Sequence, residues 1–175
     1  VLVEKPMEIS VERSQAMIAA CKAAKRQLAV GYRCQFEPHH LELIRLARER
    51  TLGSIKMIDA GFGFPIGNPT QWRMNKALSG GGSLMDIGIY ALQAARYTTG
   101  EEPVAVFAKE TTDRSDPRFR EVEDMIDFQL EFPSGVIGSC MSMYSANRNQ
   151  FVLMGDKGRI ELEPATAYSG QRMWV

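Results

Sequence analysis

Residues 80–97 of the chain read GGGSLMDIGIYALQAARY and lead to Gly100. The pattern predicts one helix with a defined beginning and end. Ser83 suits the N-cap, Asp86 completes a capping-box pattern three residues later, and Gly100 suits the left-handed position just past the helix. The three glycines predict a tight turn with close backbone packing rather than a phosphate-binding loop.

Helical spacing gives this segment two distinct faces. One face carries polar or phenolic side chains at intervals of four, three and four, namely Asp86, Tyr90, Gln93 and Tyr97. The other face carries mostly small side chains that let a neighbouring element approach closely, namely Leu84, Gly88, Ala91 and Ala95. We therefore expect a buried helix that displays two proton carriers, Asp86 and Tyr90. The alternative is that Asp86 is only a cap and Tyr90 an ordinary half-buried aromatic residue.

Composition narrows the class of protein. The chain has 175 residues, with 21 Lys and Arg against 21 Asp and Glu, and its basic residues are spread among acidic ones. This balance argues against a nucleic-acid partner. A hydrophobic content of 45% supports a real core, and no apolar run is long enough to suggest a membrane span or a membrane partner. The length suits one domain, or one domain with part of another.

The metal-binding residue types are few and scattered. Cys21, Cys34 and Cys140 form no C-x-x-C pair, and the only histidines are the adjacent His39 and His40. We therefore expect neither a disulfide scaffold nor a metal site. Unpaired cysteines favour the cytoplasm, but localisation stays open because any export signal would lie upstream of this sequence.

The beginning of the chain predicts a strand–helix–strand unit. An apolar strand at 1–3 enters a loop, Ser10 caps a helix that continues to about Ala24, and a second apolar strand follows at 28–32. Such a unit is parallel and right-handed. A parallel sheet needs more strands and helices than one crossover supplies, so we expect further residues upstream.

The rest of the chain predicts a mixed α/β (α+β) domain over residues 35–175. A helix is expected from Pro38 to about Arg50, then a strand at 54–64 and a loop before the central helix. Strands then follow one another with turn signals between them, at 104–109, 122–132, 136–145, 150–154 and 159–163. We expect a largely antiparallel open sheet with helices on one face, and a second face that is either hydrated or an oligomer interface.

Two motifs far apart carry a family resemblance. Glu4-Lys5-Pro6 ends the first strand, and residues 80–90 begin the central helix. Together they resemble the glucose-fructose oxidoreductase and inositol dehydrogenase family of nicotinamide-dependent sugar oxidoreductases. Short segments elsewhere are similar to the glucose-fructose oxidoreductase branch, at 31–34, 71–73, 100–103 and 155–157. The resemblance spans nearly the whole chain, and two ordered motifs are more specific than either alone.

The resemblance implies a two-domain enzyme that uses NADP or NAD and acts on a sugar or polyol. Its first domain would be a dinucleotide-binding fold, of which residues 1–34 would be the C-terminal remnant, because the chain contains no G-x-G-x-x-G fingerprint. The chain alone would then be inactive, and copies would associate through the open sheet. The alternative is a non-catalytic binding or oligomerisation module built on the same fold.

The resemblance also implies site residues. Lys5, Asp86 and Tyr90 would be catalytic, although many relatives have histidine where this chain has Tyr90. Because tyrosine has an ordinary pKa near ~10, we expect the Lys5 ammonium to lower the pKa of Tyr90 so that it exchanges the substrate proton. Asp86 would position substrate hydroxyls or fix Lys5, and these roles could be permuted.

Cofactor contacts are implied for a second set of residues, namely Glu4, Lys5, Pro6, Arg33, Trp72 and Arg73. A cation and an aromatic face suit phosphate and sugar-ring contacts. The alternative for Trp72 and Arg73 is a loop anchor with a surface arginine. Glu4 is expected to orient Lys5 or its loop, and Tyr144 is interpreted as an ordinary sheet residue.

Overall fold

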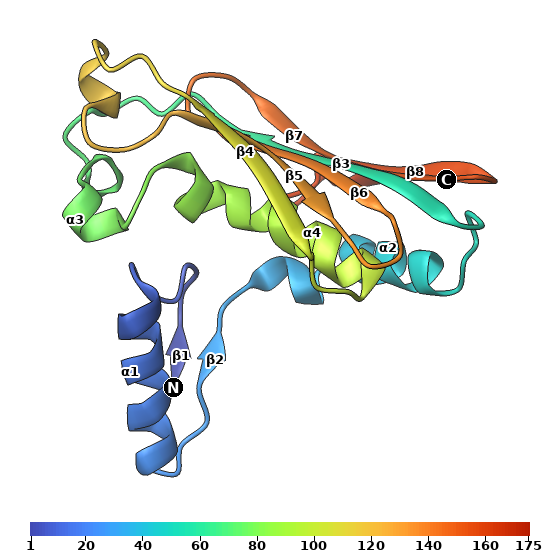
Figure 1. The fold of residues 1–175 in the computed structure, drawn as a ribbon, viewed down its shortest axis with the longest axis horizontal. Coiled ribbons are helices and arrows are strands. Elements are labelled where there is room, and N and C mark those ends of the chain that lie inside the picture. Colours follow the sequence, from blue (N-terminus) through green and yellow to red (C-terminus); the bar gives the residue numbers. More distant parts are fainter.

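The computed structural model describes residues 1–175, which form two units of unequal size (Figure 1). The smaller unit consists of strand β1 (Leu2–Val3), helix α1 (Val11–Ala23) and strand β2 (Ala29–Val30). The two strands pair in parallel, as expected. Ser10 caps α1 by accepting the Arg13 backbone N–H at 3.3 Å, and α1 has no buried residue.

The larger unit is built on a seven-stranded sheet with the order β4-β5-β6-β3-β7-β8-β9. Only the β3–β6 pair is parallel, which confirms a mixed and largely antiparallel open sheet. Strand β9 was not predicted. The strands span Ile55–Gly63 (β3), Ala105–Thr111 (β4), Met125–Glu131 (β5), Ile137–Met143 (β6), Arg148–Gly155 (β7), Gly158–Glu163 (β8) and Arg172–Trp174 (β9).

Helices α2 (Pro38–Arg48) and α4 (Ile89–Thr99) lie under one face of this sheet (Figure 1). Ala91 and Ala95 of α4 are buried in the main core, as the stripe of small residues predicted. At Gly88 an added Cβ would lie 3.1 Å from the Ser142 Oγ of β6, so glycine permits the close approach of helix and sheet. Shorter helical segments are Arg33–Phe36, Trp72–Met74, α3 (Lys76–Ser79) and Pro117–Phe119.

The beginning of the central helix differs from the prediction. It opens with a π-helical turn, Leu84–Gly88, which is a feature often found at functional sites. The expected capping box is wrong: Ser83 already has helical backbone angles, and its hydroxyl lies 3.0 Å from the Ser142 Oγ. Glu123 takes the cap instead, because its carboxylate accepts the N–H groups of Gly82 and Leu84 at 2.7 and 3.0 Å. Gly100 ends the helix in the predicted left-handed conformation, with φ 73°.

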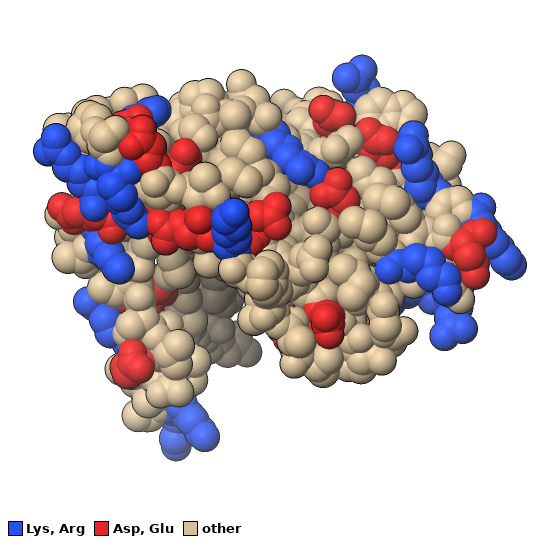
Figure 2. All heavy atoms as spheres, turned by 45° about the horizontal axis from the view of Figure 1, so that its top comes forward, with Lys and Arg blue, Asp and Glu red and all other residues tan.

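The surface carries both signs of charge without segregating them. Figure 2 shows basic and acidic side chains beside one another on the visible face. No helix of the chain combines the length and the apolar character that crossing a membrane requires.

Candidate active site

Asp86 lies at the centre of a mostly buried cluster of polar groups. Its Oδ1 is 3.1 Å from the Lys5 Nζ, and its Oδ2 accepts hydrogen bonds from the Arg73 Nε at 3.0 Å and the Tyr144 hydroxyl at 2.8 Å. Burial alone would raise the pKa of Asp86, but the Lys5 ammonium, the Tyr144 hydrogen bond and the Arg73 guanidinium together hold that pKa below its ordinary value. The carboxylate is therefore ionised at neutral pH and is occupied by three donors.

Lys5 reaches this cluster from the smaller unit. The loop that follows β1 points toward the beginning of the central helix (Figure 1), and the Lys5 Nζ donates to the Asp86 backbone oxygen as well as to its carboxylate. The two residues are 81 positions apart. The predicted association of Lys5 with Asp86 is therefore present in the folded chain.

Tyr90 lies one helical turn after Asp86, and its ring is close to Lys5. The Lys5 Nζ is 4.8 Å from the centre of the Tyr90 ring, and the ring packs against Tyr32 and Phe62 at centroid distances of 5.5 and 5.6 Å. The Tyr90 hydroxyl forms no hydrogen bond within the chain. It is not completely buried, because the only fully buried side-chain atom without a partner is the Arg33 Nε. The hydroxyl is therefore free to meet a ligand.

The expected effect of Lys5 on Tyr90 is wrong for this chain. Burial raises the pKa of Tyr90 to about 12, and the Arg33 guanidinium opposes this shift only in part. Lys5 pairs instead with Asp86, whose own negative charge further raises the pKa of Tyr90. Tyr90 is therefore protonated at neutral pH and is prepared to donate a proton or a hydrogen bond.

Tyr144 is the site residue that the sequence did not reveal. It follows β6, is fully buried, and donates its hydroxyl proton to Asp86. Burial raises its pKa first, and the neighbouring Asp86 charge adds to the shift. Its β-strand context favoured an ordinary sheet residue, and no local pattern could have indicated a partner 58 residues away.

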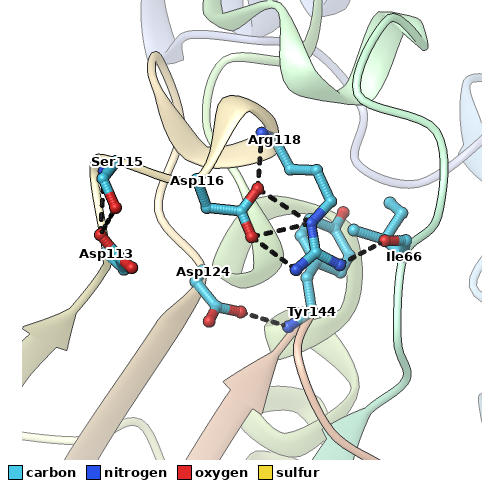
Figure 3. Close-up of polar contacts among 7 residues, drawn as sticks. All are labelled: Ile66, Asp113, Ser115, Asp116, Arg118, Asp124 and Tyr144. Atoms are coloured by element: carbon cyan, nitrogen blue, oxygen red, sulfur yellow. Dashed lines mark hydrogen bonds and ion pairs between the residues drawn. The ribbon is translucent and has the colours of Figure 1, made fainter.

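The long connection between β4 and β5 holds Tyr144 in place (Figure 3). The Asp124 carboxylate accepts the Tyr144 backbone N–H at 2.9 Å. Arg118 is held by Asp116 and donates to the Ile66 carbonyl oxygen at 2.8 Å, which ties this connection to the segment after β3. The connection therefore fixes Tyr144 through Asp124 and fixes the beginning of the central helix through Glu123.

The residues predicted to contact a cofactor have different surroundings. Trp72 is half exposed and lies 4.5 Å from the Arg73 guanidinium, which also binds Asp86. Glu4 is exposed and forms no ion pair with Lys5, and Pro6 follows Lys5 in the same half-buried loop. The Arg33 guanidinium carbon lies 5.8 Å from the centre of the Tyr90 ring, and Arg33 donates to the Thr166 and Ala167 carbonyl oxygens. The chain thus gathers Lys5, Trp72 and Arg73 around Asp86 and leaves Glu4 apart.

The fold and this cluster together match a known family. Residues 40–161, well over half of the chain, match the GFO/IDH/MocA C-terminal domain. The chain belongs to this family. The match covers strands β3 to β7, most of β8 and the central helix with Asp86 and Tyr90, whereas Lys5 and β9 lie outside it.

Individual proteins are also similar to nearly the whole chain. Aldose-aldose oxidoreductase from Caulobacter crescentus, solved with glycerol, is 58% identical with a TM-score of 0.97, over 99% of this chain and 52% of that one. D-xylose 1-dehydrogenase [NADP(+)] of Haloarcula marismortui is 33% identical over 94% of this chain and 47% of its own. GenD2 from gentamicin A biosynthesis, solved with NAD, is 28% identical with a TM-score of 0.82, over 92% of this chain and 46% of that one. The chain therefore spans about half the length of these relatives.

Proposed function

We propose that this chain is the substrate side of an NAD(P)-dependent oxidoreductase that transfers a hydride between a nicotinamide and a hydroxyl-bearing carbon of a sugar or polyol. The observation that carries the proposal is the meeting of Lys5, Asp86 and Tyr90 in a chain of this family. The names of the Caulobacter and Haloarcula relatives, an aldose oxidoreductase and a xylose dehydrogenase, support an aldose as the substrate. A two-domain organisation, with residues 1–34 as part of a dinucleotide-binding domain, is included in this proposal.

The residues present fit the nicotinamide end of such a cofactor but not its phosphates. Trp72 offers a half-exposed planar surface, and Lys5 and Arg73 offer positive charge beside it. Glu4 and Pro6 would shape the loop that carries Lys5, and Arg33 would act next to the Tyr90 ring. When bound, the nicotinamide supplies the hydride acceptor or donor. Relatives are named with NADP and solved with NAD, so both are candidates.

Side chains of this chain transfer the proton of the sugar hydroxyl. In the reductive direction, the hydroxyl of Tyr90, which its raised pKa keeps protonated at neutral pH, would donate its proton to the sugar oxygen. In the oxidative direction, the Tyr90 hydroxyl would first release its own proton to solvent, which the positive charge of Arg33 favours, and its oxygen would then accept the proton of the sugar hydroxyl. Asp86 holds Lys5 and Arg73 in place and keeps the Lys5 ammonium directed at the reacting oxygen.

The test is turnover by the full-length protein, purified without added nucleotide and assayed on xylose, glucose, and glucose with fructose. Activity that needs two sugars and no free nucleotide would indicate a retained cofactor, and activity on one sugar with added NAD or NADP would indicate an ordinary dehydrogenase. The variant Tyr90→Phe should lower kcat at least ~100-fold because it removes the proton donor. Tyr97→Phe is the matched control on the same helix, since the Tyr97 hydroxyl donates to Gln35 instead. Absence of nicotinamide binding and of turnover would favour the non-catalytic module.

We also propose that two copies associate through the open face of the sheet. Residues of β3, β6 and β7 that alternate with the helix-covered ones place five apolar side chains on that face. Met57, Met143 and Met154 are partly exposed there, whereas Met141 and Val152 are covered by their neighbours in the same chain. Sedimentation of the chain should show a dimer, and Met57→Lys, at the most exposed of these five positions, should shift it toward the monomer. The three cysteines are free, which supports a cytoplasmic location.

A further inference from the structure

The segment that follows β8 brings an exposed aromatic residue next to Arg33, which also lies near Tyr90. Tyr168 is 90% exposed, and its ring centre lies 4.1 Å from the Arg33 guanidinium carbon. The same guanidinium carbon lies 5.8 Å from the centre of the Tyr90 ring. One cation therefore links the ring of the proposed proton donor to a ring that is open to solvent.

The backbone before Tyr168 is fixed from several directions. The Ala165 N–H donates to the Asn149 carbonyl oxygen, and the Thr166 N–H and hydroxyl both donate to the Asn149 Oδ1, at 2.7 and 2.9 Å. A ring nitrogen of the buried His40 lies 2.7 Å from the Ala165 carbonyl oxygen. Ala165 and Thr166 are consequently buried, and the chain emerges at Tyr168 from a rigid base.

Arg33 also fixes the backbone before Tyr168, although one of its own donors is left without a partner. Its two terminal nitrogens donate to the Thr166 and Ala167 carbonyl oxygens, whereas its Nε is buried without any partner. A buried donor without a partner loses its hydrogen bonds to water and gains none in return. The side chain is therefore held where it orients the 166–168 segment, and not where its own donors would all be satisfied.

Burial does not explain the position of Tyr168, because a ring that is 90% exposed gains almost nothing from the hydrophobic effect. The Tyr168 and Tyr90 rings both lie within cation–π range of the Arg33 guanidinium, which brings Tyr168 into the neighbourhood of Tyr90. A rigid, exposed aromatic face beside a proton donor has the form of one wall of a ligand site. The C–H face of a sugar ring is the complementary surface.

We infer that Tyr168, oriented by Arg33, is a specificity-determining residue that stacks on the ring face of a cyclic sugar while Tyr90 meets its reacting hydroxyl. The inference rests on the proposed function and deepens it by assigning a residue that contacts the sugar ring. Stacking that is the same in the ground state and the transition state lowers KM and leaves kcat unchanged. Tyr168 would then act on the sugar alone and not on the nicotinamide.

The test compares KM and kcat of the full-length enzyme with xylose and with NADP or NAD. Tyr168→Leu should raise the KM for xylose about 3- to 10-fold, in line with the energy of an aromatic contact, with kcat within about 2-fold. Tyr168→Phe should keep the wild-type KM because it keeps the ring. The control is Trp174→Leu, which removes an aromatic ring from a similar pair with Arg172 on β9, 5.5 Å from the guanidinium carbon. That variant should leave every constant unchanged.

The outcomes separate the two proposals. An active wild type whose KM for xylose is unaffected by Tyr168→Leu would overturn the aromatic wall and leave the proposed function standing. A rise in the KM for the nicotinamide, or a fall in kcat without a change in KM, would also overturn it, because either would point to a different role. A wild type that turns over no sugar with either nucleotide would overturn both.

Discussion

Helices α1 and α4 differ sharply in how far the rest of the chain buries them, although residues in or next to each helix contribute to the candidate site. Helix α1 buries none of its residues and exposes Val11 and Ile18 by 67 and 52%. Helix α4 buries five residues, with Ala95 fully enclosed. Lys5 comes from the loop before α1, whereas Asp86 and Tyr90 come from the segment that begins α4. The site is thus shared between a unit with almost no core of its own and a unit with a well-packed one.

This difference identifies the contacts on which the position of Lys5 depends. The loop after β1 touches the larger unit at Asp86 and at the glycine turn, where an added Cβ on Gly80 would lie 2.9 Å from the Ile9 carbonyl oxygen. The thin β1–β2 pair cannot fix Lys5 by packing. We therefore conclude that the charge of Asp86, more than the packing of the smaller unit, holds the two halves of the site together.

Removing that charge should have the largest effect. Asp86→Asn leaves Lys5 and Arg73 without their counter-charge at a site where the side chains of Lys5 and Asp86 are only 13 and 14% exposed. Loss of one partner of a buried pair should lower the free energy of unfolding by about 3 kcal/mol, measured by urea denaturation of the chain. The control is Asp59→Asn, whose partner Arg148 lies on the open face with both side chains 31% exposed, and its loss should stay below about 1 kcal/mol. Equal losses in the two variants would contradict this account.

The difference in unfolding free energy between wild type and Asp86→Asn should depend on pH in a defined direction. Because the pKa of Asp86 is lowered in the folded chain, its contribution to stability is complete above the ordinary carboxyl pKa of about 3.9 and is lost as the pH falls through the folded-state value. The difference in unfolding free energy between wild type and Asp86→Asn should therefore be constant from neutral pH to about pH 5 and shrink below about pH 4. Urea denaturation at several pH values measures it. A difference that grows on acidification would show that Asp86 is not held ionised.

Local sequence patterns predicted the parts of the molecule that local interactions build. Ser10 and the apolar spacing after it gave the correct position of α1, and the alternation of Ile126, Phe128 and Leu130 gave the correct position of β5. The β9 strand was missed because three residues are too few for an alternation to be recognised. Tyr144 and the Glu123 cap were missed because each acts on a residue about 40 to 60 positions away, where neither helical nor strand periodicity carries information.

The Glu123 cap should have a smaller effect than Asp86. Glu123→Gln leaves one acceptor oxygen where the carboxylate offers one oxygen to the Gly82 N–H and the other to the Leu84 N–H, so one N–H at the start of the π-helical turn loses its partner. We expect a loss of about 1–2 kcal/mol in unfolding free energy, together with lower kcat in the full-length enzyme because Asp86 shifts with the turn. Glu121→Gln is the control in the same connection, where an exposed carboxylate accepts only the Lys76 N–H and water can replace it. A kcat unchanged by Glu123→Gln would show that the turn is held by packing alone.

The smallest effect is expected on α1, and it tests whether another part of the protein covers this helix. In the chain of residues 1–175, Ile18→Ala should change the unfolding free energy by less than about 0.5 kcal/mol, because Ile18 is already half exposed. The matched variant Ile87→Ala removes the same groups from a side chain that is 3% exposed and should cost about 2–5 kcal/mol. In the full-length protein the cost of Ile18→Ala should rise above 1 kcal/mol if a dinucleotide-binding domain packs on α1, since Ile18 would then lie in a core. An unchanged, negligible cost there would mean that α1 stays uncovered, and that Lys5 depends on Asp86 alone in the whole enzyme as well.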